Sequence, residues 1–302
     1  MISKIIVVSI PLMPKKLVWL FGKKYIAGLK IEDAVSYTKD FAKIGGGTTI
    51  DVLGEFVTEK ERAIHERDMS AIVINTIHSE KLPSYLSIKP TSCGLGIDAE
   101  FGYENIKMLV AQAKQLGIQC RIDMENSPYT TKTLDLYRRL VTEGYDNVGI
   151  VLQAYLKRTV SDIQSLLDLK PNIRLCKGIY VESAEIAYKG KEEVRDNFNK
   201  CLDLIVDNIA NGAYPAIATH DEALIRYAEN LVKSKGLQKE QYSFEMLLGV
   251  REERRNKLLQ AGHNVVVYVP FGEDWYGYST RRLKENPAMA MHIVKAIFGI
   301  GK

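Results

Sequence analysis

Two adjacent arginines stand near the C-terminus, in the stretch YVPFGEDWYGYSTRRLKENP at positions 268–287. A pair of guanidinium groups can bind a carboxylate through charge-assisted, often bidentate hydrogen bonds. Tyr278 precedes Arg281 and Arg282 by one helical turn, and Glu285 follows them by one turn. The pattern therefore predicts a helix that binds a carboxylate. Its alternative is a solvated helix with an i,i+4 ion pair.

A second group of polar residues lies at or near the ends of short apolar runs. Its members are Glu55, Lys89, Asp123, Gln153, Arg174, Lys177, His220, Glu245 and Tyr268. Singly, each has an ordinary structural explanation, since charged residues at strand ends are usually solvated or paired. Asp123 could simply pair with Arg174, and His220 could be a hydrogen-bonded structural histidine. Convergence of all of them at one place would instead indicate a functional site.

The elements that must position these residues alternate regularly from residue 48 onward. Eight runs have strand character: 48–56, 85–91, 118–125, 147–155, 172–180, 214–220, 242–248 and 264–272. Helical patterns such as 103–117 and 195–212 lie between them, and both end in glycine. Eight such units predict an α/β fold, a single (β/α)8 barrel. A doubly wound sheet is disfavoured because no G-x-G-x-x-G follows the first strand.

A barrel of this kind places its site at the C-terminal ends of its strands. The sequence has no His-x-His or carboxylate cluster typical of a metal, and no Ser or Cys placed with a His as a nucleophile pair. Gln153, Arg174 and Thr219 offer hydrogen bonds to a planar ring or to phosphate. Gly178 in KGIY allows a bulky group to approach the backbone. We therefore expect an organic cofactor and no metal, with Lys89 as a third cation for the carboxylate.

The composition of the 302-residue chain is that of an ordinary globular protein, with 46% hydrophobic and 26% charged residues. Its net charge of +4 is spread along the chain, which makes nucleic acid a poor candidate partner. Four cysteines without a C-x-x-C pair indicate reduced thiols in a cytoplasmic protein. We expect an N-terminal helical segment at 1–47, whose clearest helix is 30–45, and a barrel domain at 48–302.

The N-terminal run KIIVVSIPLM is interrupted by Pro11, lacks a cleavage motif and is too short to span a bilayer. LVWLF, at 17–21, lies between two pairs of lysines. It is expected to pack on the domain. The alternative is an interfacial contact with a membrane surface, in which Trp19 lies at the lipid boundary.

These motifs, in their order, resemble the proline dehydrogenase family over nearly the whole chain. The similar stretches are SIKPT, RIDME, LQAY, RLCKGIYVES, IATHDEALI and YVPFGEDWYGYSTRRLKENP. The size is similar to that of the monofunctional bacterial form. The resemblance implies oxidation of L-proline to Δ1-pyrroline-5-carboxylate by hydride transfer to FAD, with electrons passed to a membrane quinone. A peripheral contact with the inner face of the cell membrane is then possible.

The resemblance also implies roles for individual residues. Asp123 and Arg174 would be catalytic, with Arg174 close to flavin N5. The residues implied in substrate binding are Lys89, Leu247, Tyr268, Tyr278, Arg281, Arg282 and Glu285. The residues implied in FAD binding are Met124, Gln153, Arg174, Lys177, Gly178, Ile179, Thr219 and His220.

Two other functions remain open for the same fold. Lys177 could form a Schiff base in an aldolase or lyase, because a buried lysine at a strand end suits that chemistry. A non-catalytic barrel could instead bind an amino acid without oxidising it. A flavin absorption spectrum before and after proline is added distinguishes all three.

Overall fold

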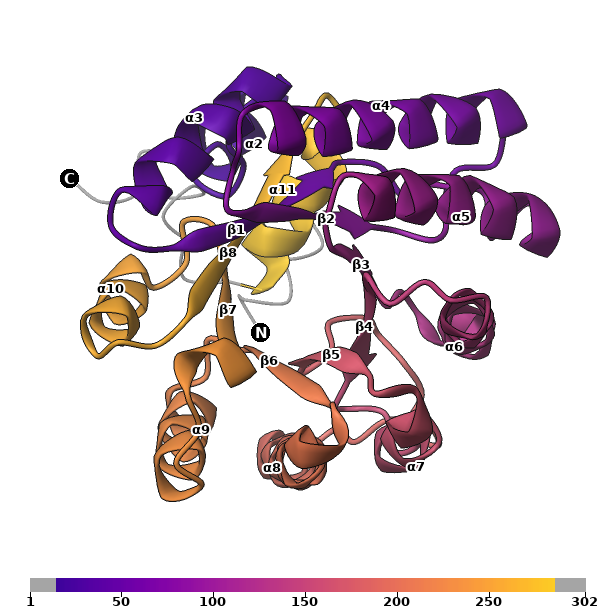
Figure 1. Ribbon diagram of the computed structural model, residues 1–302. Helices are drawn as coiled ribbons and strands as arrows, with labels where there is room; N and C mark the ends of the chain where they lie inside the picture. The colour runs from indigo at the N-terminus through magenta and orange to yellow at the C-terminus, as the bar shows by residue number, and fades with distance from the viewer. Residues whose placement is uncertain (1–14, 286–302) are drawn as a thin grey trace.

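Eight parallel strands form a closed barrel in which each strand pairs with the next along the chain and β8 pairs with β1 (Figure 1). The computed structural model describes residues 15–285, apart from the side chains of Lys16, Leu17, Phe21 and 281–285. The strands are β1 (Gly47–Val52), β2 (Ser84–Ile88), β3 (Cys120–Ile122), β4 (Val148–Gln153), β5 (Asn172–Cys176), β6 (Tyr214–Ala218), β7 (Ser243–Leu247) and β8 (Val265–Phe271). The predicted (β/α)8 barrel is confirmed.

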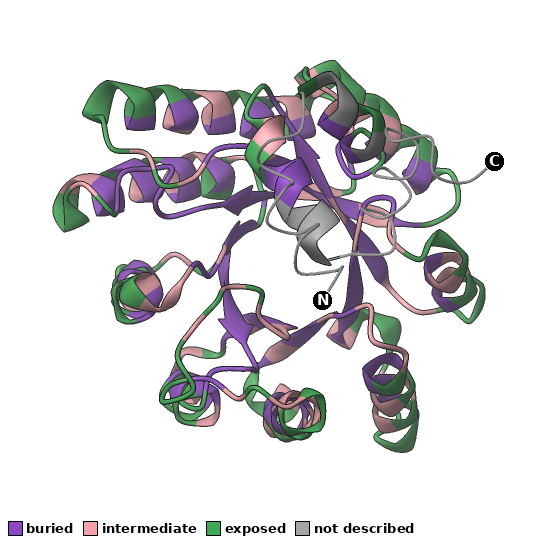
Figure 2. Cartoon of the chain, turned by 180° about the vertical axis from the view of Figure 1, so that it is seen from behind, coloured by how far each residue is buried: buried purple, intermediate pink, exposed green. Residues whose placement is uncertain are grey.

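Helices follow the strands and surround the barrel, with buried residues on their inner faces and exposed residues outside (Figure 2). Those after the first seven strands are α4 (Lys60–Ser79), α5 (Ala99–Gln115), α6 (Ser127–Thr142), α7 (Thr159–Gln164), α8 (Lys191–Asp207), α9 (Glu222–Ser234) and α10 (Glu252–Gln260). Short 3₁₀ turns lie at Leu167–Leu169, Ile209–Asn211 and Lys239–Gln241. Among the described residues, the helices α2 (Lys15–Gly22) and α3 (Ile31–Ala42) precede the barrel, and α11 (Trp275–Glu285) follows it.

Local sequence explains where these helices begin and end. The Asp98 side chain accepts a hydrogen bond from the Phe101 N–H at 2.7 Å and so caps α5. Gly117 follows α5 with φ of +69°, a conformation that costs glycine little and other residues more. The predicted helix 103–117 therefore starts four residues earlier than its apolar pattern, because the cap and not the pattern sets its beginning.

Several strands are shorter than their apolar runs predicted. The run 118–125 contains only the three residues of β3, and 172–180 contains only the five of β5. Asp123 still donates its backbone N–H to the Ile88 carbonyl at 2.8 Å, one residue beyond β3. The residues that follow leave the hydrogen-bond ladder and form the loops around the barrel mouth.

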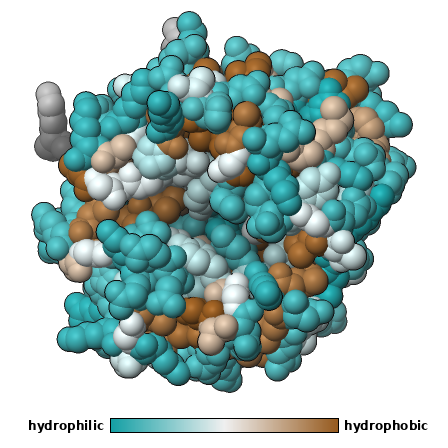
Figure 3. Space-filling view, in the orientation of Figure 1, coloured by the Kyte–Doolittle hydropathy of each residue, from teal (hydrophilic) through white to brown (hydrophobic). Residues whose placement is uncertain are grey.

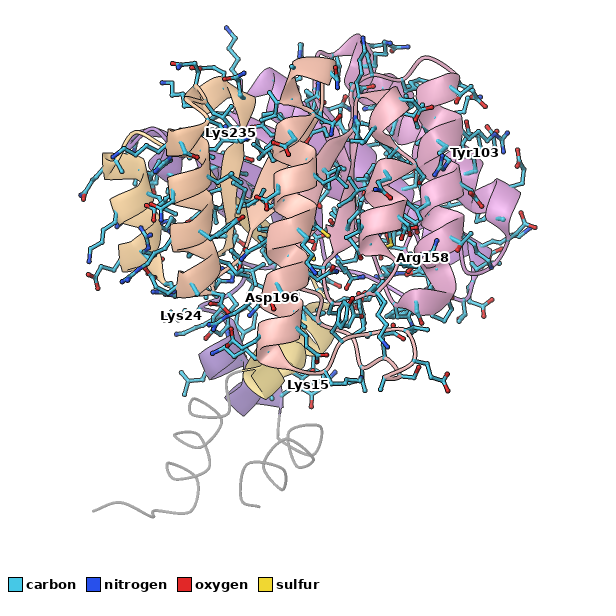
Figure 4. The ribbon with its side chains drawn as sticks, turned by 90° about the horizontal axis from the view of Figure 1, so that it is seen from below. Lys15, Lys24, Tyr103, Arg158, Asp196 and Lys235 are labelled. Carbon is cyan, nitrogen blue, oxygen red and sulfur yellow. The ribbon has the colours of Figure 1, made fainter. Side chains whose placement is uncertain are left out.

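The first and last described helices, α2 and α11, pack side by side across the mouth (Figure 4). Figure 4 shows Lys15 at this end of the molecule and Lys235 at the opposite end. The rings of Trp19 and Trp275 meet edge to face with centroids 4.8 Å apart. Val18 is fully buried, which agrees with the expected packing on the domain, whereas Leu20 is 54% exposed. Within residues 15–285, none of the helices combines the length and the apolar composition needed to cross a bilayer.

Candidate active site

A cavity of about 730 Å³ lies at the C-terminal ends of the strands. This volume is within the range of roughly 300–1,000 Å³ that is usual for small-molecule sites. All of the predicted site residues whose side chains the structure describes line it. They are Lys89, Asp123, Met124, Gln153, Arg174, Lys177, Gly178, Ile179, Thr219, His220, Leu247, Tyr268 and Tyr278. The convergence expected from the strand ends is therefore present.

The paired arginines belong to the helix that borders this cavity. Tyr278, in the first half of α11, is buried and lines the cavity wall. Arg281, Arg282 and Glu285 occupy the second half of α11, and their side chains lie outside the described residues. Their role in binding a carboxylate therefore stays a prediction.

Lys89 is one of the buried cations of the cavity. Its ammonium group donates to the Asp51 carboxylate and, at 3.0 Å, to the Tyr268 hydroxyl. Burial lowers the pKa of Lys89, but Asp51 and Asp123 outweigh it and raise the pKa above its ordinary value, so the amine stays charged. Burial raises the pKa of Asp51 to about 6 although Lys89 opposes the shift. Lys89 therefore keeps its positive charge, whereas the Asp51 carboxylate beside it binds a proton at a higher pH than an ordinary aspartate does.

Asp123 connects this pair to Arg174. Its two oxygens accept hydrogen bonds from the Tyr268 hydroxyl at 2.9 Å and from the Ser87 hydroxyl at 2.8 Å. Arg174 also donates to Asp123 at 3.0 Å, so the simple pairing considered from the sequence does occur. It is one bond of a larger network, because Arg174 reaches across the barrel to Glu245 as well.

The other side of the cavity has the features of a cofactor cradle. Gly178 has φ of +99°, and a Cβ atom there would lie 2.1 Å from the Tyr155 ring, so only glycine fits. The Gln153 amide donates to the Glu125 carbonyl at 2.8 Å, which fixes the side chain at the cavity wall. The Leu247 N–H donates to Nε2 of His220 at 2.9 Å, so a neutral His220 carries its proton on Nδ1.

This cradle fits a planar cofactor with phosphates. Gly178 lines this cavity where its missing side chain makes room for the Tyr155 ring, and amide, ammonium and hydroxyl groups at the ends of β4, β5 and β6 face the same cavity. In the described part of the chain, no three His, Cys, Asp or Glu side chains are grouped so that they could hold a metal ion.

Lys177 differs from the buried lysine that the Schiff-base alternative assumed. Its side chain is 41% exposed and lies 3.3 Å from Asp221. Arg195 binds the same carboxylate at 2.8 Å. A Schiff-base lysine is activated by desolvation or by a neighbouring cation. Lys177 has solvent and a carboxylate instead, and this geometry counts against the aldolase alternative.

Four polar residues near the cavity were not singled out from the sequence: Asp51, Tyr85, Ser87 and Glu125. Asp51, Tyr85 and Ser87 lie within their strands and not at the ends, and Glu125 follows the end of β3. The available signal was the period of two within a strand, because Tyr85, Ser87 and Lys89 alternate along β2 and its continuation and so face the same side. Glu125 is buried and is bound by the Thr91 N–H at 2.8 Å and by the Thr91 hydroxyl.

A second cavity, of about 840 Å³, opens at the N-terminal end of the barrel. Figure 3 shows a hollow at the centre of this face, with hydrophilic and hydrophobic patches around it. Tyr85, Arg121 and Tyr214 are among the residues that line it, and Glu245 lines both cavities. We assign the chemistry to the mouth, although its cavity is smaller, because barrel enzymes react at the C-terminal face and the predicted side chains gather there.

Comparison with known proteins identifies the family. The model of the proline dehydrogenase family matches residues 34–294. The chain is 37% identical to proline dehydrogenase 1 of Bacillus subtilis (strain 168), over 92% of this chain and 91% of that protein. It is 35% identical to the proline dehydrogenase of Deinococcus radiodurans, over 94% of this chain and 92% of that protein.

The fold is shared with a solved structure. Proline utilization A from Bdellovibrio bacteriovorus, inactivated by N-propargylglycine, superposes with a TM-score of 0.83 at 23% identity. The match covers 88% of this chain and 32% of that one, and at this identity it supports the barrel fold alone. The family model and the relatives above 30% identity carry the assignment: the chain is an enzyme of the proline dehydrogenase family.

Proposed function

We propose that this enzyme oxidises L-proline to Δ1-pyrroline-5-carboxylate with non-covalently bound FAD. The observation that carries the proposal is one cavity with two different sides. Lys89 lies on one side, which α11 with Arg281 and Arg282 in its sequence borders, and the strand ends around Gly178 lie on the other. A zwitterionic amino acid fits the first side and a flavin the second.

In this proposal the protein holds and orients the substrate. Lys89, Arg281 and Arg282 bind the proline carboxylate, which places C5 toward the cradle. When bound, FAD would accept a hydride at its N5 atom. Oxidation of proline with a neutral amine removes this hydride from C5 and releases the proton on nitrogen to solvent, which leaves the C=N bond. Asp123 and Arg174 lie between the two sides, and the hydrogen bonds to Tyr268 and Ser87 fix their positions.

The other proposed roles follow from position in the cavity. Tyr268, Leu247 and Tyr278 line the cavity and would enclose the pyrrolidine ring. The role of Glu285 in holding an arginine rests on its helical spacing from Arg281 and Arg282. The proposed FAD ligands are Met124, Gln153, Arg174, Lys177, Gly178, Ile179, Thr219 and His220.

An absorption spectrum tests the proposal directly. The purified protein is expected to be yellow, to release FAD on denaturation and to bleach when L-proline is added without oxygen. Recovery of FMN or of no chromophore from well-folded protein would overturn it. Trapping of a carbonyl substrate by borohydride would favour the aldolase, and proline binding without bleaching a non-catalytic barrel.

We further propose that a membrane quinone reoxidises the flavin, and that α2 contacts the inner face of the cell membrane. Trp19 is half-buried, and its ring meets that of Trp275. Leu20 is 54% exposed and Lys15 is exposed, and both remain available to a lipid surface. The expected result is salt-sensitive binding to anionic vesicles.

Charge reversal provides the test of this contact. Lys15→Glu/Lys16→Glu is expected to weaken vesicle binding and to leave dye-linked proline oxidation unchanged, because both residues precede the barrel. Binding that is absent, or that is indifferent to the reversal, would refute the membrane contact without touching the catalytic proposal.

A further inference from the structure

Glu245 forms a closed ring of hydrogen bonds with Arg174 and Tyr85 in the barrel interior. Nε of Arg174 donates to Oε2 of Glu245, and the Tyr85 hydroxyl donates to Oε1 at 2.6 Å. Nη2 of Arg174 donates to the same tyrosine hydroxyl at 3.2 Å. Glu245 and Arg174 are buried, so the ring fixes one edge of the guanidinium plane out of contact with bulk solvent.

The remaining edge of the guanidinium is only partly used. Nη1 of Arg174 donates to Ser87 at 3.2 Å and to Asp123 at 3.0 Å. A guanidinium has five N–H donors in a rigid plane. One contact involves Nε, two involve Nη1 and one involves Nη2, so Nη2 keeps one N–H without a partner among residues 15–285. Because Arg174 lines the mouth cavity, a ligand there can accept that bond.

We propose that Glu245, with Tyr85, is a positioning residue of the redox site that aims the remaining Nη2 N–H of Arg174 into the cavity. This inference rests on the proposed function, since it supposes a flavin and a substrate on either side of Arg174. Glu245 binds Nε of Arg174, and Tyr85 bridges Glu245 and Nη2 of Arg174. Neither residue needs to contact the substrate.

Charge as well as geometry supports this role. Burial raises the pKa of Glu245, but Arg174 and Arg121 outweigh it and hold the pKa below its ordinary value, so the carboxylate stays ionised. Arg121 lies 3.7 Å from Oε1 on the side of the N-terminal cavity. Without Glu245, Asp123 would be the one carboxylate among the described residues that still accepts a hydrogen bond from Arg174. Asp123 would then be drawn away from Tyr268 and the Lys89 end of the network.

Three variants separate positioning from simple stability. Glu245→Gln keeps the shape and an acceptor but removes the charge. Tyr85→Phe removes only the hydroxyl that completes the ring. Ser243→Ala is the matched control, because the Ser243 hydroxyl contacts Glu245 at 3.4 Å and does not contact Arg174.

The measurements are anaerobic flavin reduction by proline, the Kd of a competitive carboxylate inhibitor, and the flavin reduction potential. We expect Glu245→Gln and Tyr85→Phe to slow flavin reduction about 10- to 100-fold, the loss expected for a misdirected charge-assisted hydrogen bond. Inhibitor Kd should change less than about threefold, because other cations hold the carboxylate. The potential should become more positive only in Glu245→Gln, since losing a buried negative charge favours the added electrons.

Each outcome decides the inference. Unchanged reduction rates in well-folded variants, or a change confined to inhibitor Kd or thermal stability, would overturn it. If Glu245→Gln fails to fold, Tyr85→Phe alone decides by its reduction rate. Failure of the proposed function is distinguishable, because the wild-type protein would then hold no FAD or would not bleach with proline.

Discussion

Lys89 and Lys177 occupy similar places in the sequence and very different places in the structure. Each follows a short strand, each lines the mouth cavity, and each pairs with an aspartate. The Lys89 side chain is 9% exposed, whereas that of Lys177 is 41% exposed. Asp51 has Lys89 as its cation partner, whereas Asp221 has Arg195 in addition to Lys177.

The difference in burial decides what each charge contributes. Breaking a buried ion pair leaves an uncompensated charge and costs about 3–5 kcal/mol, whereas an exposed pair contributes about 0–1 kcal/mol. Lys89 is therefore part of the framework, held in one position by Asp51 and Tyr268. Lys177 retains the freedom of a solvated side chain and can adjust to a ligand. The same residue type thus serves as a fixed charge at one strand end and as an adjustable one at another.

The largest expected effect comes from removing the buried lysine. Lys89→Met should lower the free energy of unfolding by about 3–5 kcal/mol at neutral pH, because Asp51 is left buried without its cation. It should also raise the KM for proline, since one of the cations proposed for the carboxylate is lost. Chemical denaturation and steady-state kinetics measure the two effects.

A double variant shows whether the orphaned charge is the cause. Lys89→Met/Asp51→Asn removes both charges and should recover a large part of the stability without recovering the KM. If the double variant is as unstable as Lys89→Met alone, cavity formation and not charge explains the loss.

Glu125, a buried carboxylate without an ion pair among residues 15–285, extends the comparison to pH. Burial raises the pKa of Glu125 to about 7, and the Thr91 hydrogen bonds only partly oppose this. Because the folded pKa exceeds the ordinary value near 4.3, the stabilisation is complete below that value and is lost as pH rises through about 7. Relative to Glu125→Gln, the wild-type protein should therefore lose on the order of 3 kcal/mol between pH 4.5 and 8.

Urea denaturation of both proteins across this range provides the measurement. The difference between them isolates Glu125 from other groups that titrate, among them Asp51. Parallel pH dependences in the two proteins would show that Glu125 is ionised in the folded state at ordinary pH.

The arginines of α11 are expected to act on binding and little on folding. Arg281→Met or Arg282→Met should cost about 1.5–3 kcal/mol in transition-state binding, a loss of about one to two decades in kcat/KM, mostly through KM. FAD content should stay unchanged, and Glu285→Gln should give a smaller loss. Wild-type kinetics in both arginine variants would mean that the motif is only a solvated helix.

The sequence predicted the barrel and the lining of its cavity better than it predicted where the strands end. The barrel followed from eight β-branched runs separated by helical patterns, because periodicity is a local property. The cavity lining followed from one rule, that strand ends converge at the mouth. The ends of strands were less predictable. Ile179 and Tyr180 continue an apolar run, yet they lie in the loop after β5, since the ladder ends at Cys176.

Partnerships across the barrel were not predictable in the same way. Asp51 was missed because its role depends on its contact with Lys89, which is 38 residues away in the sequence. The pairing of β1 with β2 brings the two side chains together. The packing of α2 on α11 joins segments more than 250 positions apart, and no local pattern in either helix specifies the other. Burial, which separates Lys89 from Lys177, is likewise a property of the folded molecule.

The smallest effect is expected at the exposed lysine, and it completes the comparison. Lys177→Met should change the free energy of unfolding by less than about 1 kcal/mol, because the pair is solvated and Asp221 keeps its bidentate contact with Arg195 at 2.8 and 3.1 Å. Asp221 also continues to cap α9 through the Ala223 N–H. If Lys177 binds the cofactor as proposed, FAD affinity should fall in Lys177→Met and largely return in Lys177→Arg. Fluorescence titration of the apoprotein with FAD, beside urea denaturation, measures both quantities. A loss of stability as large as that of Lys89→Met would show that exposure is the wrong criterion for separating the two lysines.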